Sequence, residues 1–170
     1  MNPAYFGDSY DVVKRFFCHE LRVLGYSVSA LPMFTGEWER MQSEFLRFVG
    51  AKPIESSSVE SGRGALFVDP DTGVHRESSQ KHVSLRELAT HTEKYRIVFS
   101  FDQSFSRQHV AMNAMREKLA LLAEAGCSAL YYNSHARFLF VSAENEPLSE
   151  FRAHIESLGL PAFRFVTRDT

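Results

Sequence analysis

The sequence predicts an α/β fold: a Rossmann-like three-layer sandwich with a mainly parallel sheet and an antiparallel hairpin at one edge. Short apolar runs alternate with amphipathic stretches along most of the chain, which is typical of strand–helix units around a parallel sheet. The run Ala65–Val68 is apolar without alternation, as in strands buried on both faces. The runs Ser128–Tyr132 and Phe138–Ser142 are separated by five residues, which indicates a hairpin.

The first third of the chain is expected to contain two helices and two strands. Val13, Leu21 and Leu24 recur at helical spacing, Asp8 or Ser9 can cap the helix, and Gly25 suits its end. Lys14 is expected to face solvent. The elements expected here are a helix over 9–24, a strand over 26–31, a helix over about 35–48 that Thr35 opens, a surface loop over 50–64 that has room for a short strand, and the strand 65–68.

The remaining elements follow the same alternation after a polar loop over 72–81. Ser84 and Glu87 match a capping box, because each side chain can accept from a free amide of a first helical turn. Pro147 suits the first turn of the last helix, and Gly159 suits its end. The elements expected here are a helix from Ser84, strands over 96–101, 128–132, 138–142 and 163–166, and helices over 107–125 and 147–158.

Bulk composition indicates one α/β domain over residues 1–170 with an ordinary core. Apolar residues make up 44% of the chain and charged residues 24%, and the net charge is −2. That charge provides no global basic field for nucleic acid, although local basic patches are compatible with it. Cys18 and Cys127 have no metal-ligand spacing and are expected to be reduced core thiols. Without an apolar run of about 20 residues or a leader pattern, the chain is expected to be cytoplasmic and not membrane-bound; the oligomeric state is left open.

Carboxylates follow two of the predicted strands directly. Asp69 and Asp71 come after Ala65–Val68, and Asp102 comes after the strand 96–101. Because ligands of open α/β folds bind outside the carboxyl ends of the strands, these acids are expected to share a site. Three carboxylates suit Mg²⁺ or Mn²⁺, which would offset the charge of a phosphate substrate. The alternative is a simple turn, since Asp, Pro and Gly are ordinary turn residues.

Five further residues are candidates for chemistry around that metal. Lys81, His82 and His135 are candidate catalytic residues, because each lies near the end of an element and can exchange or hold a proton. Ser104 and Arg107 lie at the start of the longest helix, where amides and a cation favour phosphate. The alternative for Ser104 is an N-cap, and for Arg107 a solvated surface residue.

Two known families have motifs similar to this stretch. Asp69 and Asp71 after an apolar strand resemble the first motif of haloacid-dehalogenase-type phosphatases, which implies phosphoryl chemistry; the late acidic pair of that family has no counterpart here. Asp69-Pro70 also resembles the Asp/Asn-Pro-Pro-aromatic turn of amino-methyltransferases that use S-adenosylmethionine. In this chain the second proline and the aromatic residue are absent.

Three functions are therefore weighed. The first is a metal-dependent enzyme acting on a phosphate ester or nucleic acid, a nuclease or phosphohydrolase. The second is an S-adenosylmethionine methyltransferase-like domain, with which the hairpin over 128–142 is compatible. The third is a non-catalytic protein-binding domain, which an exposed patch of the 15 Phe and 6 Tyr residues would favour.

Overall fold

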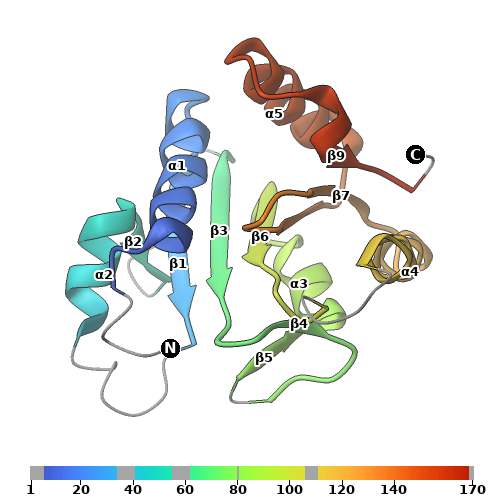
Figure 1. Ribbon diagram of the computed structural model, residues 1–170, viewed down its shortest axis with the longest axis horizontal. Coiled ribbons are helices and arrows are strands. Elements are labelled where there is room, and N and C mark those ends of the chain that lie inside the picture. Colours follow the sequence, from blue (N-terminus) through green and yellow to red (C-terminus); the bar gives the residue numbers. More distant parts are fainter. Residues whose placement is uncertain (1–5, 34–40, 55–61, 80, 106–110, 169–170) are drawn as a thin grey trace.

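A computed structural model describes residues 6–33, 41–54, 62–79, 81–105 and 111–168 (Figure 1). Its centre is a seven-stranded sheet in the order β2-β1-β3-β6-β8-β7-β9. The strands are β1 (Ser27–Pro32), β2 (Lys52–Pro53), β3 (Gly64–Asp69), β6 (Ile97–Phe101), β7 (Ser128–Tyr132), β8 (Phe138–Ser142) and β9 (Phe165–Val166). A separate two-stranded parallel sheet joins β4 (Gly73–His75) and β5 (His82–Ser84). The predicted mixed α/β class with a mostly parallel sheet is confirmed.

Most strands of the large sheet run in one direction. β2, β1, β3 and β6 pair in parallel, and β8 is antiparallel to β6. β7 is antiparallel to β8 and therefore runs with β6, while β9 is antiparallel to β7. The hairpin of β7 and β8 forms as expected, but its predicted place at the edge is wrong. Because β8 returns between β6 and β7, both hairpin strands are interior and the short β9 takes the edge.

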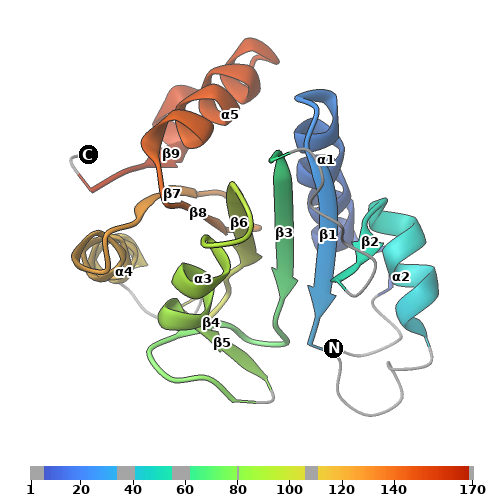
Figure 2. The same cartoon turned by 180° about the vertical axis from the view of Figure 1, so that it is seen from behind.

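Helices cover both faces of the sheet. α1 (Ser9–Val23), α2 (Gln42–Val49) and α5 (Asn145–Ser157) pack in one apolar cluster, and α3 (Leu85–His91) and α4 (Ala111–Glu124) pack in the other. In Figure 1 α1 lies in front of the sheet, and in Figure 2, seen from behind, α3 lies in front. Within the described ranges, no helix has the length and apolar character that a membrane crossing requires.

Aromatic rings fill the core beneath α1 and α5. Phe67, Phe99 and Phe140 stack across neighbouring strands, with ring centroids 4.9 and 5.5 Å apart. Phe17 of α1 and Phe151 of α5 pack against the same layer and are at most 1% exposed. Most of the described phenylalanines therefore serve the core.

Local signals in the sequence account for several boundaries. Asp8 caps α1 by accepting from the amides of Tyr10 and Asp11, and Ser84 and Glu87 form the predicted capping box of α3. Cys18 is buried and Cys127 is half-buried, and both thiols are free. The predicted start of a helix near Thr35 and the first turn of the helix over 107–125 lie outside the described residues. The predicted loop over 72–81 is wrong in part, since it contains β4 and leads into β5.

Candidate functional site

The candidate site lies at the carboxyl ends of β1 and β3. From β1 the chain passes through α2 to β2 on one side, and from β3 it passes through α3 to β6 on the other side. α2 and α3 also lie on opposite faces of the sheet. In open α/β sheets, ligands bind in the crevice outside two neighbouring strands whose following connections lead in opposite directions. Asp69 ends β3 level with Pro32, the last residue of β1, and therefore stands at this switch point.

The Asp69 side chain is buried in an ion-pair cluster with two residues of α1. Lys14 Nζ donates to Asp69 Oδ2 at 2.9 Å and lies 3.0 Å from Asp11 Oδ1. The three side chains are at most 2% exposed. The expectation that Lys14 faces solvent is wrong, because Asp11, Lys14, Cys18 and Leu21 all lie on the buried side of α1. One ammonium thus serves two carboxylates, and the cluster carries a net negative charge when all three are ionised.

The two oxygens of Asp69 differ in their surroundings. Oδ1 is buried, and among the described residues no group donates a hydrogen bond to it. A buried carboxylate oxygen without a donor is destabilising, and such an oxygen in a native structure calls for an explanation. A bound ligand that offers an N–H, an O–H or a cation at the switch point would supply the missing donor.

Burial and charge act against each other on this cluster. Burial by itself lowers the pKa of Lys14, but the charges of Asp69 and Asp11 outweigh it and raise the pKa above its usual value. Burial raises the pKa of Asp69, and the attraction of Lys14 offsets only part of that rise. Lys14 therefore stays protonated, and Asp69 holds its charge less readily than an exposed carboxylate does.

Asp102, the acid at the end of the neighbouring strand β6, is fully hydrogen-bonded. Its Oδ1 accepts from the amides of Val74 and Ser104, both at 3.0 Å. Its Oδ2 accepts from Lys118 Nζ at 2.6 Å and from the Tyr131 hydroxyl at 2.7 Å. A carboxylate has about four lone-pair positions, so Asp102 has none left over. A metal at Asp102 would have to displace one of these donors.

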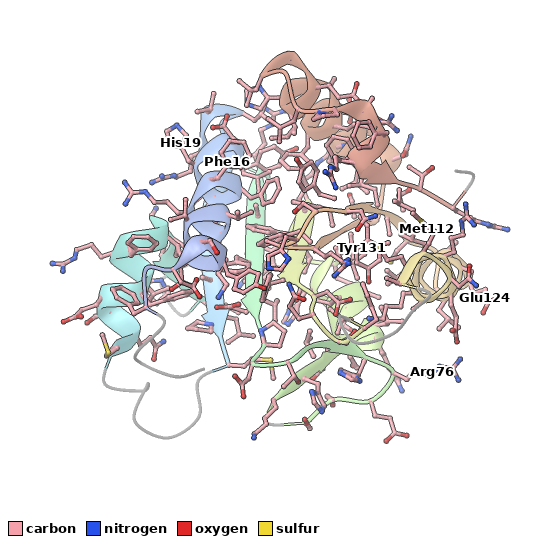
Figure 3. All side chains as sticks on the ribbon, viewed as in Figure 1. Phe16, His19, Arg76, Met112, Glu124 and Tyr131 are labelled. Atoms are coloured by element: carbon pink, nitrogen blue, oxygen red, sulfur yellow. The ribbon has the colours of Figure 1, made fainter. Side chains whose placement is uncertain are left out.

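The contacts of Asp102 join three elements to the end of β6. Lys118 of α4 also donates to the carbonyl of Val74 in β4 and to the hydroxyl of Ser104. Tyr131 of β7 lies in the interior, whereas Arg76, just after β4, lies at the periphery (Figure 3). Burial raises the pKa of the Tyr131 hydroxyl, and the charge of Asp102 adds to that rise. Asp102 therefore serves as an anchor for β4, α4 and β7.

The three predicted metal ligands are not gathered around one point. Within the part of the chain that the structure describes, no three His, Cys, Asp or Glu side chains are placed to hold a metal ion. Of the three predicted ligands, Asp69 is the residue for which the described part of the chain leaves a buried oxygen without a donor. Asp71, two residues further along the chain, is half-buried. Within the described ranges, Asp69 Oδ1 has room for a cation, whereas both oxygens of Asp102 are engaged.

His135 lies in the β7–β8 loop and pairs with α1. Its Nε2 is 2.7 Å from the Tyr10 hydroxyl, and the two rings stack with centroids 5.3 Å apart. The side chain of Gln103, next to Asp102, donates to the His135 carbonyl at 2.9 Å. His135 therefore lies at the same end of the sheet as Asp102, in an exposed position.

The other predicted residues are dispersed. His82 is half-buried in β5, where its ring contacts the ring of His75, and Lys81 beside it is exposed. The Ser104 hydroxyl is taken up by Lys118. Arg107 lies outside the described residues.

Sequence reasoning missed the residues that hold these carboxylates. Lys14 and Asp11 carried a usable signal, since both fall on the apolar side of an otherwise amphipathic helix, where a charged residue needs a partner. Lys118 lies on the helix face that also carries Met115, Leu119 and Leu122, and its partner could have been sought in the same way. Tyr131 gave no such signal, because a tyrosine in an apolar strand is ordinary.

The phenylalanines do not form an exposed surface in the described ranges. Of those described, Phe163 is the exposed one, at 75%. This distribution goes against the aromatic interface that a protein-binding role would use. A scan against protein-family models and searches of curated proteins and of solved structures find no match to the chain.

Proposed function

We propose that the chain is a Rossmann-like, three-layer domain of the S-adenosylmethionine methyltransferase type, with its ligand site at the switch point of β1 and β3. The observation that carries the proposal is Oδ1 of Asp69 at the carboxyl end of β3, which is buried and has no donor among the residues that the structure describes. The place of β8 supports it as well, because an antiparallel strand between β6 and β7 is compatible with the methyltransferase architecture.

The charge of the site suits a ligand that carries donors or positive charge. The cluster of Asp11, Lys14 and Asp69 has two carboxylates for one ammonium, so it favours an amine or another cation over a phosphate. When bound, S-adenosylmethionine supplies a methyl group to a nucleophilic atom such as an amine nitrogen. Asp69 Oδ1 would accept an N–H from the ammonium group of the bound S-adenosylmethionine and so fix its position, while Lys14 keeps the carboxylate in place.

A metal-dependent phosphohydrolase or nuclease is the second candidate. It is favoured by the spacing of Asp69 and Asp71, which offers two carboxylates for Mg²⁺ or Mn²⁺ at the end of β3. In this case Lys81, His82 and His135 would act in proton transfer, and Ser104 and Arg107 would contact phosphate. The full hydrogen bonding of Asp102 leaves this candidate with one ligand fewer than the sequence suggested.

Calorimetric titration of the purified protein with S-adenosylmethionine, and separately with Mn²⁺, tests the choice. We expect S-adenosylmethionine to bind at one site and Asp69→Asn to weaken binding by about 10- to 100-fold, the range of a hydrogen bond to a charged group. The reason is that the amide carbonyl introduced by this substitution must face Lys14, which turns the NH₂ group toward the ligand. Asp71→Asn serves as the matched control and should leave this affinity unchanged.

The same titrations distinguish the second candidate. Binding of Mn²⁺ that is lost in both Asp69→Asn and Asp71→Asn, without any heat from S-adenosylmethionine, would replace the methyltransferase proposal by the metal-dependent one. The absence of heat in both titrations, at protein concentrations of about 100 μM where a Kd of 1 mM or below is detectable, would contradict both.

A further inference from the structure

The small β4–β5 sheet brings two imidazole rings together outside the site at Asp69. His82 lies opposite Gly73, and His75 lies opposite Ser84, so the two histidines are diagonal neighbours on one face of the ribbon. Their ring centroids are 4.1 Å apart, with the ring planes at 36°.

A hydrogen bond from Thr72 determines which nitrogen of His82 is available. The Thr72 hydroxyl lies 3.1 Å from the carbonyl of Lys81, to which it can only donate. Its oxygen must then accept from the nitrogen that it also contacts, Nδ1 of His82. When the His82 ring is neutral, these contacts place its proton on Nδ1 and leave the lone pair on Nε2. Metal-binding histidines are oriented in the same way, by donating their other ring N–H to an oxygen.

The His75 ring is the second candidate ligand, and it faces the His82 ring across the ribbon. No hydrogen bond engages the His75 ring among the described residues. The two cations near the ring each have a carboxylate partner, since Lys118 pairs with Asp102 and Arg76 pairs with Glu117.

We propose that His75 and His82 form a two-histidine site for a divalent transition metal ion, with Zn²⁺ as the preferred ion. Nε2 of His82 and one ring nitrogen of His75 supply two ligands, and solvent or a small anion completes the coordination. Imidazole suits Zn²⁺, Ni²⁺ and Cu²⁺, whereas Mg²⁺ and Mn²⁺ prefer the oxygens of carboxylates. The site therefore differs in its ligand chemistry from the carboxylates at the end of β3.

The surroundings make this an open site and not a closed structural one. A structural zinc site uses four protein ligands, and the described residues offer no third His, Cys, Asp or Glu here. His75 lines a cavity of about 200 Å³ together with Ser104, Phe105 and Lys118. Free coordination positions next to a cavity would let a bound metal take a further ligand from solution.

Zinc titration of the untagged protein, followed by long-range proton–nitrogen spectra of the histidine rings, tests this inference. We expect one Zn²⁺ to bind and to shift the Nε2 resonance of His82 and one ring nitrogen of His75, while His19 is unaffected. His19 is exposed on α1 and points away from the molecule, so His19→Ala is the matched control (Figure 3). His75→Ala and His82→Ala should each weaken zinc binding at least tenfold.

Two further variants show whether zinc binds to this histidine pair or elsewhere on the molecule. Thr72→Val removes the hydroxyl that fixes the His82 tautomer and should weaken zinc binding about 10- to 100-fold, while Nε2 and its ring remain. Asp69→Asn should leave zinc binding unchanged, which keeps this result independent of the function proposed above. Equal shifts of all histidines, or unchanged affinity in a folded His75→Ala protein, would overturn the inference. The ring spectra of the unmodified protein decide the matter even where a variant does not fold.

Discussion

Two carboxylates at neighbouring strand ends have opposite surroundings in this molecule. Asp102 accepts four hydrogen bonds, from Val74, Ser104, Lys118 and Tyr131, whereas Asp69 is paired with Lys14 through one oxygen and, among the described residues, has no donor at the other. The difference lies in the donors that other elements bring to each strand end. Asp102 therefore holds the fold together, and Asp69 has capacity left for a ligand.

The anchor role of Asp102 predicts a large loss of stability in Asp102→Asn. Both oxygens of Asp102 accept hydrogen bonds, so in either orientation of the asparagine amide the NH₂ group faces other donors. The negative charge that pairs with Lys118 is also lost. We expect a decrease of about 3–5 kcal/mol in the free energy of unfolding, measured by urea denaturation. Glu117→Gln, which removes one partner of an exposed ion pair, should cost less than about 1 kcal/mol. An Asp102→Asn protein of normal stability that no longer binds Mn²⁺ would show that Asp102 is a ligand instead.

The buried cluster on α1 predicts a similar loss in Lys14→Met. The substitution keeps an apolar chain of similar length but leaves the carboxylates of Asp11 and Asp69 buried without their cation. We expect about 3–5 kcal/mol of destabilisation. Arg15→Met changes the neighbouring, exposed cation of the same helix and should stay within about 1 kcal/mol of the parent protein. Equal effects of the two variants would mean that Lys14 is not the partner of Asp69.

Among the helices and strands, the sequence predicted those with a clear apolar pattern. Helix α1 carries apolar residues at helical spacing, and strands β3 and β6 are short continuous apolar runs. The β4–β5 ribbon escapes prediction because strands of three residues are too short for any period to show. Its position depends on Gly73 and on Asp102, which lie apart in the chain, so no local pattern indicates it.

The close contact between Gly73 of β4 and the residues that follow β6 predicts that Gly73→Ala is destabilising. Gly73 has a φ of +107°, and a Cβ there would lie 2.5 Å from Asp102 Oδ1 and 2.8 Å from the Gln103 amide nitrogen. Since a backbone atom cannot move aside cheaply, we expect a loss of about 2–4 kcal/mol in thermal or urea unfolding. Gly126→Ala is the matched control. It has a φ of +80° with nothing within 4 Å of the added Cβ, and should cost about 1 kcal/mol. Equal costs would rule out a close contact at Gly73.

For the molecule as a whole, the sequence predicted the class of fold but not the order of its strands. Apolar runs such as Ala65–Val68 identify buried strands, and alternation with helices favours a parallel sheet. The place of β8 between β6 and β7 depends on how the hairpin folds back, which its turn of five residues does not specify. Asp69 was singled out by its place after an apolar strand, while its partner Lys14 comes from a helix 55 residues earlier and has no local link to it.

The histidines predict that the whole protein loses stability in mild acid. Burial lowers the pKa of His75 and of His91 in the folded state below the ordinary value of 6.5. As the pH falls below 6.5, these histidines therefore bind protons in the unfolded chain before they do so in the folded protein. The free energy of unfolding is highest above that pH and decreases progressively below it. The raised pKa of Asp69 acts in the opposite direction, since folding favours its protonated form.

Urea midpoints at pH values of about 7.5, 6.5 and 5.5, on either side of the ordinary histidine pKa, measure this effect. We expect the midpoint to fall across the series and to fall less in His91→Gln, which removes one of the two contributions. The charges of Glu87 and Lys94 near His91 act on its pKa in opposite directions, so they leave burial as the main cause. A constant midpoint, or an unchanged slope in His91→Gln, would contradict the assignment.

The proposed function depends on Asp69 receiving its missing donor from a ligand bound at the switch point of β1 and β3. A crystal structure of the protein with S-adenosylhomocysteine, the product that remains after methyl transfer, would show this ligand in place. We expect ligand density outside the carboxyl ends of β1 and β3 at the switch point. A ligand seated elsewhere, such as the groove between α3 and α4, would contradict the proposal, as would an Asp69 Oδ1 satisfied by the protein itself.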